Sequence, residues 1–117
     1  MNKTIAIDFD GTLAEFGERI GDNHIGKPID GGRESVQRLK DEGYVIIIYT
    51  CRGNLTPVKE WLDKHKIPYD YLNENPHQPE SISPNKMYAD LYIDDRGVHH
   101  NGDWEDTLKF IEEMNKK

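Results

Sequence analysis

One segment constrains the fold more than any other. Val45–Tyr49 is an unbroken apolar run that is rich in β-branched residues and has no polar member. A strand with one face in water alternates apolar and polar residues, so this run predicts a strand that is buried on both faces. Such strands are typical of parallel sheets flanked by helices. The run is far too short to cross a bilayer.

The rest of the chain alternates short apolar segments with helical patterns. Strands are expected at 4–7, 69–72 and 89–93. Helices are expected from roughly Gly32 to Glu42, from Thr56 as N-cap with Pro57 at the first helical position, and after Asp103 as N-cap. We expect Trp61 and Trp104 to lie on the core faces of the last two helices. Alternating strands and helices predict an α/β, Rossmann-like three-layer sandwich with a central parallel sheet.

The length of 117 residues predicts a single domain that spans 1–117. Two segments fall outside the pattern of strands and helices. Residues 13–29 are rich in glycine and charge and are expected to form a flap-like segment or small hairpin, whereas 73–85 contain three prolines and are expected to form a loop.

Charge and cysteine content restrict the partners and the compartment. Fifteen basic against twenty-two acidic residues give a net charge of −7, which makes nucleic acid and anionic membranes unfavourable partners. The single cysteine, Cys51, cannot form an intrachain disulfide, and Ile5–Ile7 is too short for the apolar region of a signal peptide. These features predict a cytoplasmic protein.

Polar side chains gather where the expected strands end. In open parallel sheets, ligands bind beyond the carboxyl ends of the strands. The alternative is that these residues only cap strands and form solvated turns, and the agreement of four segments favours a site. The candidate residues are Asp8 and Asp10 after the first strand, Thr50 and Arg52 after the second, Asp94 and Asp95 after the fourth, and Lys86 before the fourth.

These groups suit phosphoryl chemistry. Asp8, Asp94 and Asp95 offer the oxygen ligands that Mg²⁺ prefers, and a carboxylate beside that ion can attack phosphorus. Thr50 and Lys86 can hold phosphoryl oxygens. Asp10 can protonate the leaving oxygen and then activate water. Arg52 is a candidate either for substrate contact or for capping the helix that follows it.

The sequence Asp8-Phe9-Asp10-Gly11-Thr12 resembles the DxDGT motif of the haloacid dehalogenase (HAD) superfamily. Thr50, Lys86 and Asp94-Asp95 match its second, third and fourth motifs in order. The resemblance implies a small capless member, similar to bacterial and phage HAD-like hydrolases. It also implies that Asp8 is the nucleophile, Asp10 the general acid/base, and Thr50 and Lys86 phosphate ligands. Mg²⁺ would be held by Asp8, the Asp10 carbonyl and Asp94, with Asp95 nearby.

We therefore expect a Mg²⁺-dependent phosphatase that hydrolyses a small phosphomonoester through an aspartyl-phosphate intermediate. The alternatives are a phosphotransferase of the same fold, a polynucleotide end phosphatase, which the negative charge disfavours, and a receiver-like signalling domain, whose motif order differs. Without a cap, either the segments 13–29 and 73–85 wall the site or a second subunit covers it, and we expect a homo-oligomer.

Overall fold

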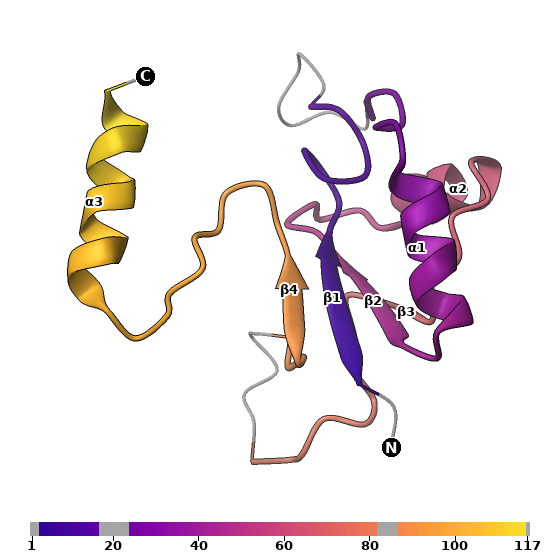
Figure 1. The fold of residues 1–117 in the computed structure, drawn as a ribbon. Helices are drawn as coiled ribbons and strands as arrows, with labels where there is room; N and C mark the ends of the chain where they lie inside the picture. Colours follow the sequence, from indigo (N-terminus) through magenta and orange to yellow (C-terminus); the bar gives the residue numbers. More distant parts are fainter. Residues whose placement is uncertain (1–2, 17–23, 82–86, 117) are drawn as a thin grey trace.

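The computed structural model describes residues 3–16, 24–81 and 87–116. Four parallel strands form one sheet in the order β3-β2-β1-β4, with three helices outside it (Figure 1). This arrangement confirms the predicted Rossmann-like α/β class around a parallel sheet, and the described residues contain no separate cap domain. The elements are β1 (Thr4–Asp8), α1 (Gly32–Asp41), β2 (Val45–Tyr49), α2 (Thr56–Lys64), β3 (Tyr71–Leu72), β4 (Leu91–Ile93) and α3 (Trp104–Asn115).

The two central strands form the buried middle of the molecule. β1 pairs with β2 from Thr4 opposite Val45 to Asp8 opposite Tyr49, and the interior residues of both strands are fully buried. The unbroken apolar run of β2 is thus explained, because neither of its faces reaches water. β4 and β3 are the edge strands, and β4 is exposed along its whole length.

Helices α1 and α2 cover one face of the sheet. Val36 of α1 and Val58, Trp61 and Leu62 of α2 join the core formed by one side of β1 and β2. The indole ring of Trp61 meets the ring of Phe9 edge-on, with 5.1 Å between centroids. The predicted burial of Trp61 is confirmed.

The expected N-cap of α2 was wrong by one residue. Thr56 is the first helical residue, and Leu55 precedes it in helical conformation without a capping side chain. The side chain of Asn54 instead accepts a hydrogen bond from the Thr56 backbone N–H at 3.2 Å. Asn54 therefore satisfies a free amide of the first turn that a threonine cap would otherwise serve.

Helix α3 stands apart from the sheet, at the end of an extended segment that leaves β4 (Figure 1). The predicted N-cap is confirmed, since the Asp103 carboxylate accepts a hydrogen bond from Glu105 N at 3.0 Å. The expectation that Trp104 faces the core is wrong, because its side chain is 66% exposed. Residues 94–103 carry the helix away from the sheet face on which a tryptophan could be buried.

The flap-like and loop segments are described in part. The two arms of 13–29 run side by side as a short hairpin, with Glu15 N bonded to Lys27 O and Ile29 N to Leu13 O at 2.8 Å each. Residues 17–23 of this segment and 82–85 of the 73–85 loop lie outside the described residues. Among the described helices, none combines the length and apolar character needed to span a bilayer.

Candidate active site

Three carboxylates meet at the carboxyl ends of β1 and β4. Asp8 is the last residue of β1, and Asp94 and Asp95 directly follow β4, which pairs with β1. One carboxylate oxygen of each of the three lies within 4.8 Å of the others. The structure thus brings together three of the four residues expected to hold a metal.

Two carboxylates of the cluster have pKa shifts in opposite directions. Burial, followed by the negative charges of Asp94 and Asp95, raises the pKa of Asp8 from 3.8 to about 6. Asp94 shows the opposite direction: hydrogen bonds from the Arg96 N–H and the Tyr49 hydroxyl lower its pKa. The charged form is thus disfavoured at Asp8 and favoured at Asp94.

Tyr49 and Asn73 are site residues that the sequence analysis missed. The Tyr49 hydroxyl donates to Asp94 Oδ2 at 2.8 Å and so fixes the carboxylate of the loop after β4. Asn73 accepts a hydrogen bond from Thr50 N at 2.8 Å and donates to Thr50 O at 3.0 Å. Asn73 also has a positive φ of 55°, a conformation that asparagine tolerates better than most residues. Asn73 could have been identified from the sequence, because it is one of the polar residues that directly follow β3.

Thr50 lies at the carboxyl end of β2, as expected. The side chain of Asn73 hydrogen-bonds to both the backbone N–H and the carbonyl of Thr50. The Thr50 hydroxyl accepts a hydrogen bond from Arg52 N at 3.1 Å. The position of the threonine is therefore set by the loops after β2 and β3 together. Lys86, the other expected phosphate ligand, lies outside the described residues.

Asp10 is turned toward Arg52. Arg52 Nε and Nη2 donate to the two carboxylate oxygens of Asp10 at 2.8 Å each, a bidentate pair. Nη2 also donates to the carbonyl of His24 at 2.9 Å, and the guanidinium lies 6.0 Å from the centroid of the Phe9 ring. Arg52 therefore links Asp10 to the second arm of the flap-like segment.

Gly11 allows the turn after β1 to approach the acidic cluster. Its φ is +87°, and an added Cβ would collide with the Asp95 carboxylate and the Phe16 ring. The carbonyl of Phe9 accepts hydrogen bonds from Leu13 and Ala14 at 2.9 and 3.1 Å, which closes the turn. This local geometry explains why a glycine follows Asp10.

A hollow of about 920 Å³ lies beside Asp94. It extends from the ends of β2 and β4 to the segment that leads to α3, and its lining includes Tyr49, Thr50, Asn73, Asp94, His99 and His100. It offers room next to Asp94 for the body of a substrate.

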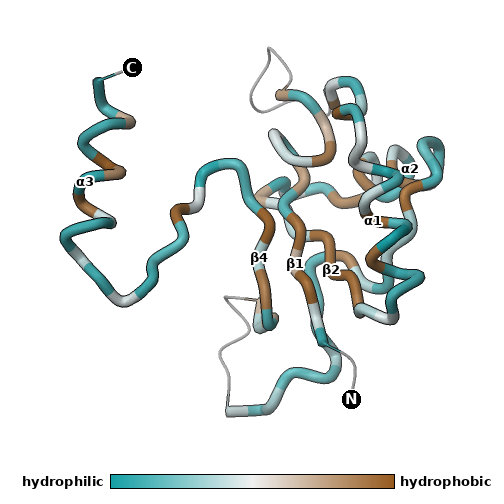
Figure 2. Tube along the Cα trace, viewed as in Figure 1, coloured by the Kyte–Doolittle hydropathy of each residue, from teal (hydrophilic) through white to brown (hydrophobic). Residues whose placement is uncertain are grey.

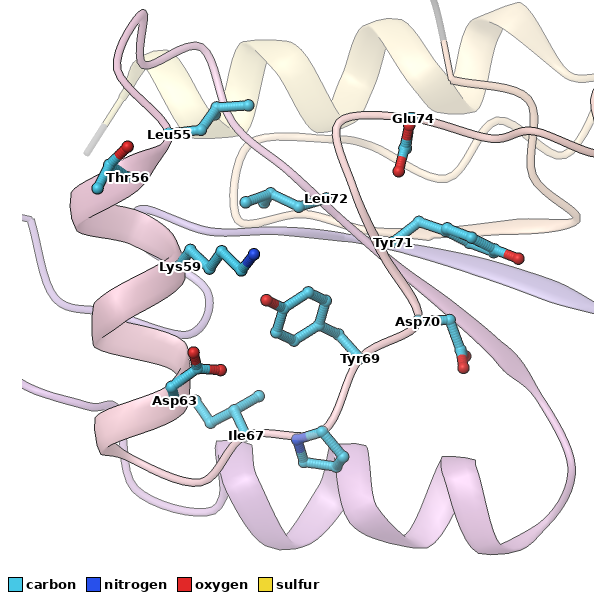
Figure 3. Close-up of a pocket in the computed structure, with 11 residues that line it drawn as sticks. Leu55, Thr56, Lys59, Asp63, Ile67, Tyr69, Asp70, Tyr71, Leu72 and Glu74 are labelled. Carbon is cyan, nitrogen blue, oxygen red and sulfur yellow. The ribbon is translucent and has the colours of Figure 1, made fainter.

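A second hollow of about 710 Å³ lies between α2 and β3 (Figure 3). Lys59, Asp63 and Tyr69 line it, and burial together with the charge of Asp63 raises the pKa of Tyr69. None of the described candidate residues lines this hollow, and its described acidic residues do not gather as Asp8, Asp94 and Asp95 do. We therefore place the candidate site at the carboxyl ends of β1, β2 and β4.

Comparison with known proteins gives a structural relative. No family model and no curated protein matches the chain. The solved structure of a conserved protein from Bacteroides thetaiotaomicron is similar over 97% of this chain and 93% of its own, with 30% sequence identity and a TM-score of 0.67. This chain and the Bacteroides protein belong to one family. A crystal structure of a Vibrio cholerae protein shares the fold at 24% identity, with a TM-score of 0.53 over 96% of this chain and 98% of its own.

Proposed function

We propose that this protein is a Mg²⁺-dependent phosphatase that hydrolyses a small phosphomonoester through a covalent intermediate on Asp8. The observation that carries the proposal is the meeting of Asp8, Asp94 and Asp95 at the sheet edge, with Asp10 two residues beyond Asp8. The adjoining hollow and the clamped Thr50 support it. The resemblance of residues 8–12 to the HAD motif points the same way.

The donor set fits Mg²⁺. This ion prefers carboxylate and carbonyl oxygens and keeps several waters, so a cluster open to solvent on one side suits it. Asp8, Asp94 and Asp95 would hold it, and the Asp10 carbonyl is the expected fourth protein ligand. When bound, Mg²⁺ would neutralise the cluster and the charge on the phosphoryl oxygens.

The chain's own groups would divide the reaction into two steps. A carboxylate oxygen of Asp8 attacks phosphorus, and the ester bond breaks as the leaving oxygen takes a proton from Asp10. Asp10 then accepts a proton from water, which attacks the same phosphorus and releases inorganic phosphate and free Asp8. Thr50 would hold a non-bridging oxygen through both steps.

Arg52 supports the second step in particular. Its bidentate contact holds the Asp10 carboxylate in one orientation. In that ion pair the carboxylate is an acceptor, which is the form that removes a proton from water.

The direct test compares Asp8→Asn with Asp63→Asn, an aspartate on α2 away from the site. With an aryl phosphate and Mg²⁺, we expect Asp8→Asn to reduce turnover by at least about 1,000-fold, because the amide is not a nucleophile. Asp63→Asn should retain activity. Turnover by Asp8→Asn within tenfold of the parent would overturn the covalent mechanism. Released phosphate, measured with and without an added alcohol, distinguishes hydrolysis from phosphotransfer.

A further inference from the structure

The chain carries two apolar surfaces that nothing in its described part covers. The first is on α3, where Trp104, Leu108, Phe110, Ile111 and Met114 are all exposed. Their spacing places them on one broad side of the helix, opposite the charged residues. Figure 2 shows apolar positions recurring along this isolated helix. A helix with so wide an apolar side ordinarily packs against another element.

The second surface is on β4. Leu91 pairs in register with Ile5, and Ile93 with Ile7, so both side chains lie on the face of the sheet that α1 and α2 cover. Leu91 is nevertheless 56% exposed and Ile93 41% exposed, whereas Ile5 and Ile7 are buried. Among the described residues, the helical layer thus ends beside β1, and no helix covers β4 (Figure 1).

The segment between the two surfaces keeps them apart. All residues from 94 to 103 are exposed, and their end is joined firmly to the helix. His100 Nδ1 hydrogen-bonds to Thr107 Oγ1 at 2.7 Å, and its ring packs on Trp104 with 4.6 Å between centroids. The extended segment and α3 therefore form an arm that projects from β4.

The chain exposes more surface than a compact monomer of its mass. A compact monomer of this mass has about 6,600 Å² of accessible surface, and this chain has 8780 Å². Its radius of gyration is 15.5 Å, against about 13.4 Å for a compact domain of this length. Two chains that covered all of this excess would bury about 4,400 Å² in total; this upper limit leaves room for the roughly 2,000–5,000 Å² of an obligate homodimer.

We propose that two copies of this chain form a dimer by exchanging their C-terminal arms, so that α3 of each copy packs over Leu91 and Ile93 of the other. The exchanged helix extends the layer of α1 and α2 across β4. Arm exchange requires only surfaces that one chain already contains, and two-fold symmetry satisfies both copies at once. The proposal does not rest on the proposed phosphatase activity.

The first test is the mass in solution by light scattering, from low micromolar to hundreds of micromolar protein. We expect twice the chain mass of 13.6 kDa. Leu108→Glu places a charge in the apolar side of α3 and should raise the dimer dissociation constant by at least about tenfold. The matched control, Lys109→Glu, introduces the same side chain on the polar side and should leave the constant unchanged. A monomer at every concentration, or equal effects of the two variants, would overturn the proposal.

The second test distinguishes exchange from an arm that folds back on its own chain. All versions carry Cys51→Ser, because the native thiol is exposed. One chain carries Leu108→Cys and another Leu91→Cys, and the two are mixed, incubated and mildly oxidised. A disulfide between the chains supports exchange, and Lys109→Cys in place of Leu108→Cys should give little of it. A third version carries Leu91→Cys and Leu108→Cys in the same chain. If its two cysteines form only an intrachain disulfide and the protein is monomeric, the proposal fails.

Discussion

Among single residues, Asp8 couples the stability of the chain to pH. Its pKa is about 6 in the folded protein, chiefly through burial and next through the charge of Asp94, against 3.8 for an ordinary aspartate. Between these values the folded state binds more protons than the unfolded state, so the free energy of unfolding falls as pH rises. The stabilisation is complete below pH 3.8 and lost above about pH 6.

We therefore expect the melting temperature of the metal-free protein to fall more steeply from pH 4 to pH 6 than that of Asp8→Asn, which has no carboxyl proton to release. Calorimetry in metal-free buffer measures both curves. The lowered pKa of Asp94 acts below this window. Parallel curves for the two proteins would contradict the assignment.

Arg52 gives a second prediction at this scale. Arg52→Lys retains the charge but cannot make the bidentate contact to Asp10. We expect turnover of alkyl and aryl phosphates to fall about 10- to 100-fold, because Asp10 loses the fixed orientation in which it activates water in the second step. Arg33→Lys, at an exposed pair with Glu34, should have no effect. Steady-state kinetics with alkyl and aryl phosphates measure the change, and unchanged rates would rule out a positioning role.

The sequence predicted the acidic cluster but not the groups that position it. Asp8, Asp94 and Asp95 follow predicted strands, and parallel strands bring their carboxyl ends to one edge. The contacts of Tyr49 with Asp94 and of Asn73 with Thr50 depend on strand register and loop conformation. Neither property can be derived from the spacing of residues along one chain.

At the scale of elements, Gly11 in the turn after β1 can be compared with Gly31, the residue directly before α1. Gly11 and Gly31 have φ angles of +87° and +84°, but an added Cβ meets the Asp95 carboxylate only at Gly11. Gly31→Ala should cost about 1–2 kcal/mol for the backbone conformation alone. Gly11→Ala should cost more and should weaken Mg²⁺ binding, because Asp95 must move. Urea unfolding and calorimetric titration measure the two effects, and equal losses of stability would contradict the close contact.

The secondary structure was largely predictable because it follows local patterns. The continuous run of β2 and the aspartate that caps α3 both identify their elements directly. The position of α3 was not predictable, since an amphipathic pattern shows that a helix has an apolar side and not what covers it. The prediction that Trp104 faces the core rests on this pattern alone.

For the whole molecule, we expect Mg²⁺ binding to raise the free energy of unfolding. A ligand that binds only the folded chain raises its stability by about 2.7 kcal/mol at 100 times its dissociation constant, and Mg²⁺ would also relieve the repulsion among the three carboxylates. We expect added Mg²⁺ to raise the melting temperature of the parent protein and to have a much smaller effect on Asp94→Ala. Asp41→Ala, on the far end of α1, is the matched control. An equal rise in all three proteins would show that the cluster is not the binding site.

The strand order also determines when each strand can pair with its neighbours during synthesis of the chain. β1 is synthesised first but lies between β2 and β4, and β4 begins at Leu91. At about 5–20 residues per second, roughly 4 to 17 s separate the completion of β1 from the start of β4. During this time one edge of β1 has no strand to pair with, and Asp8 is the only member of the acidic cluster that has been made. The nascent chain can assemble the acidic cluster only after Asp95 has been synthesised.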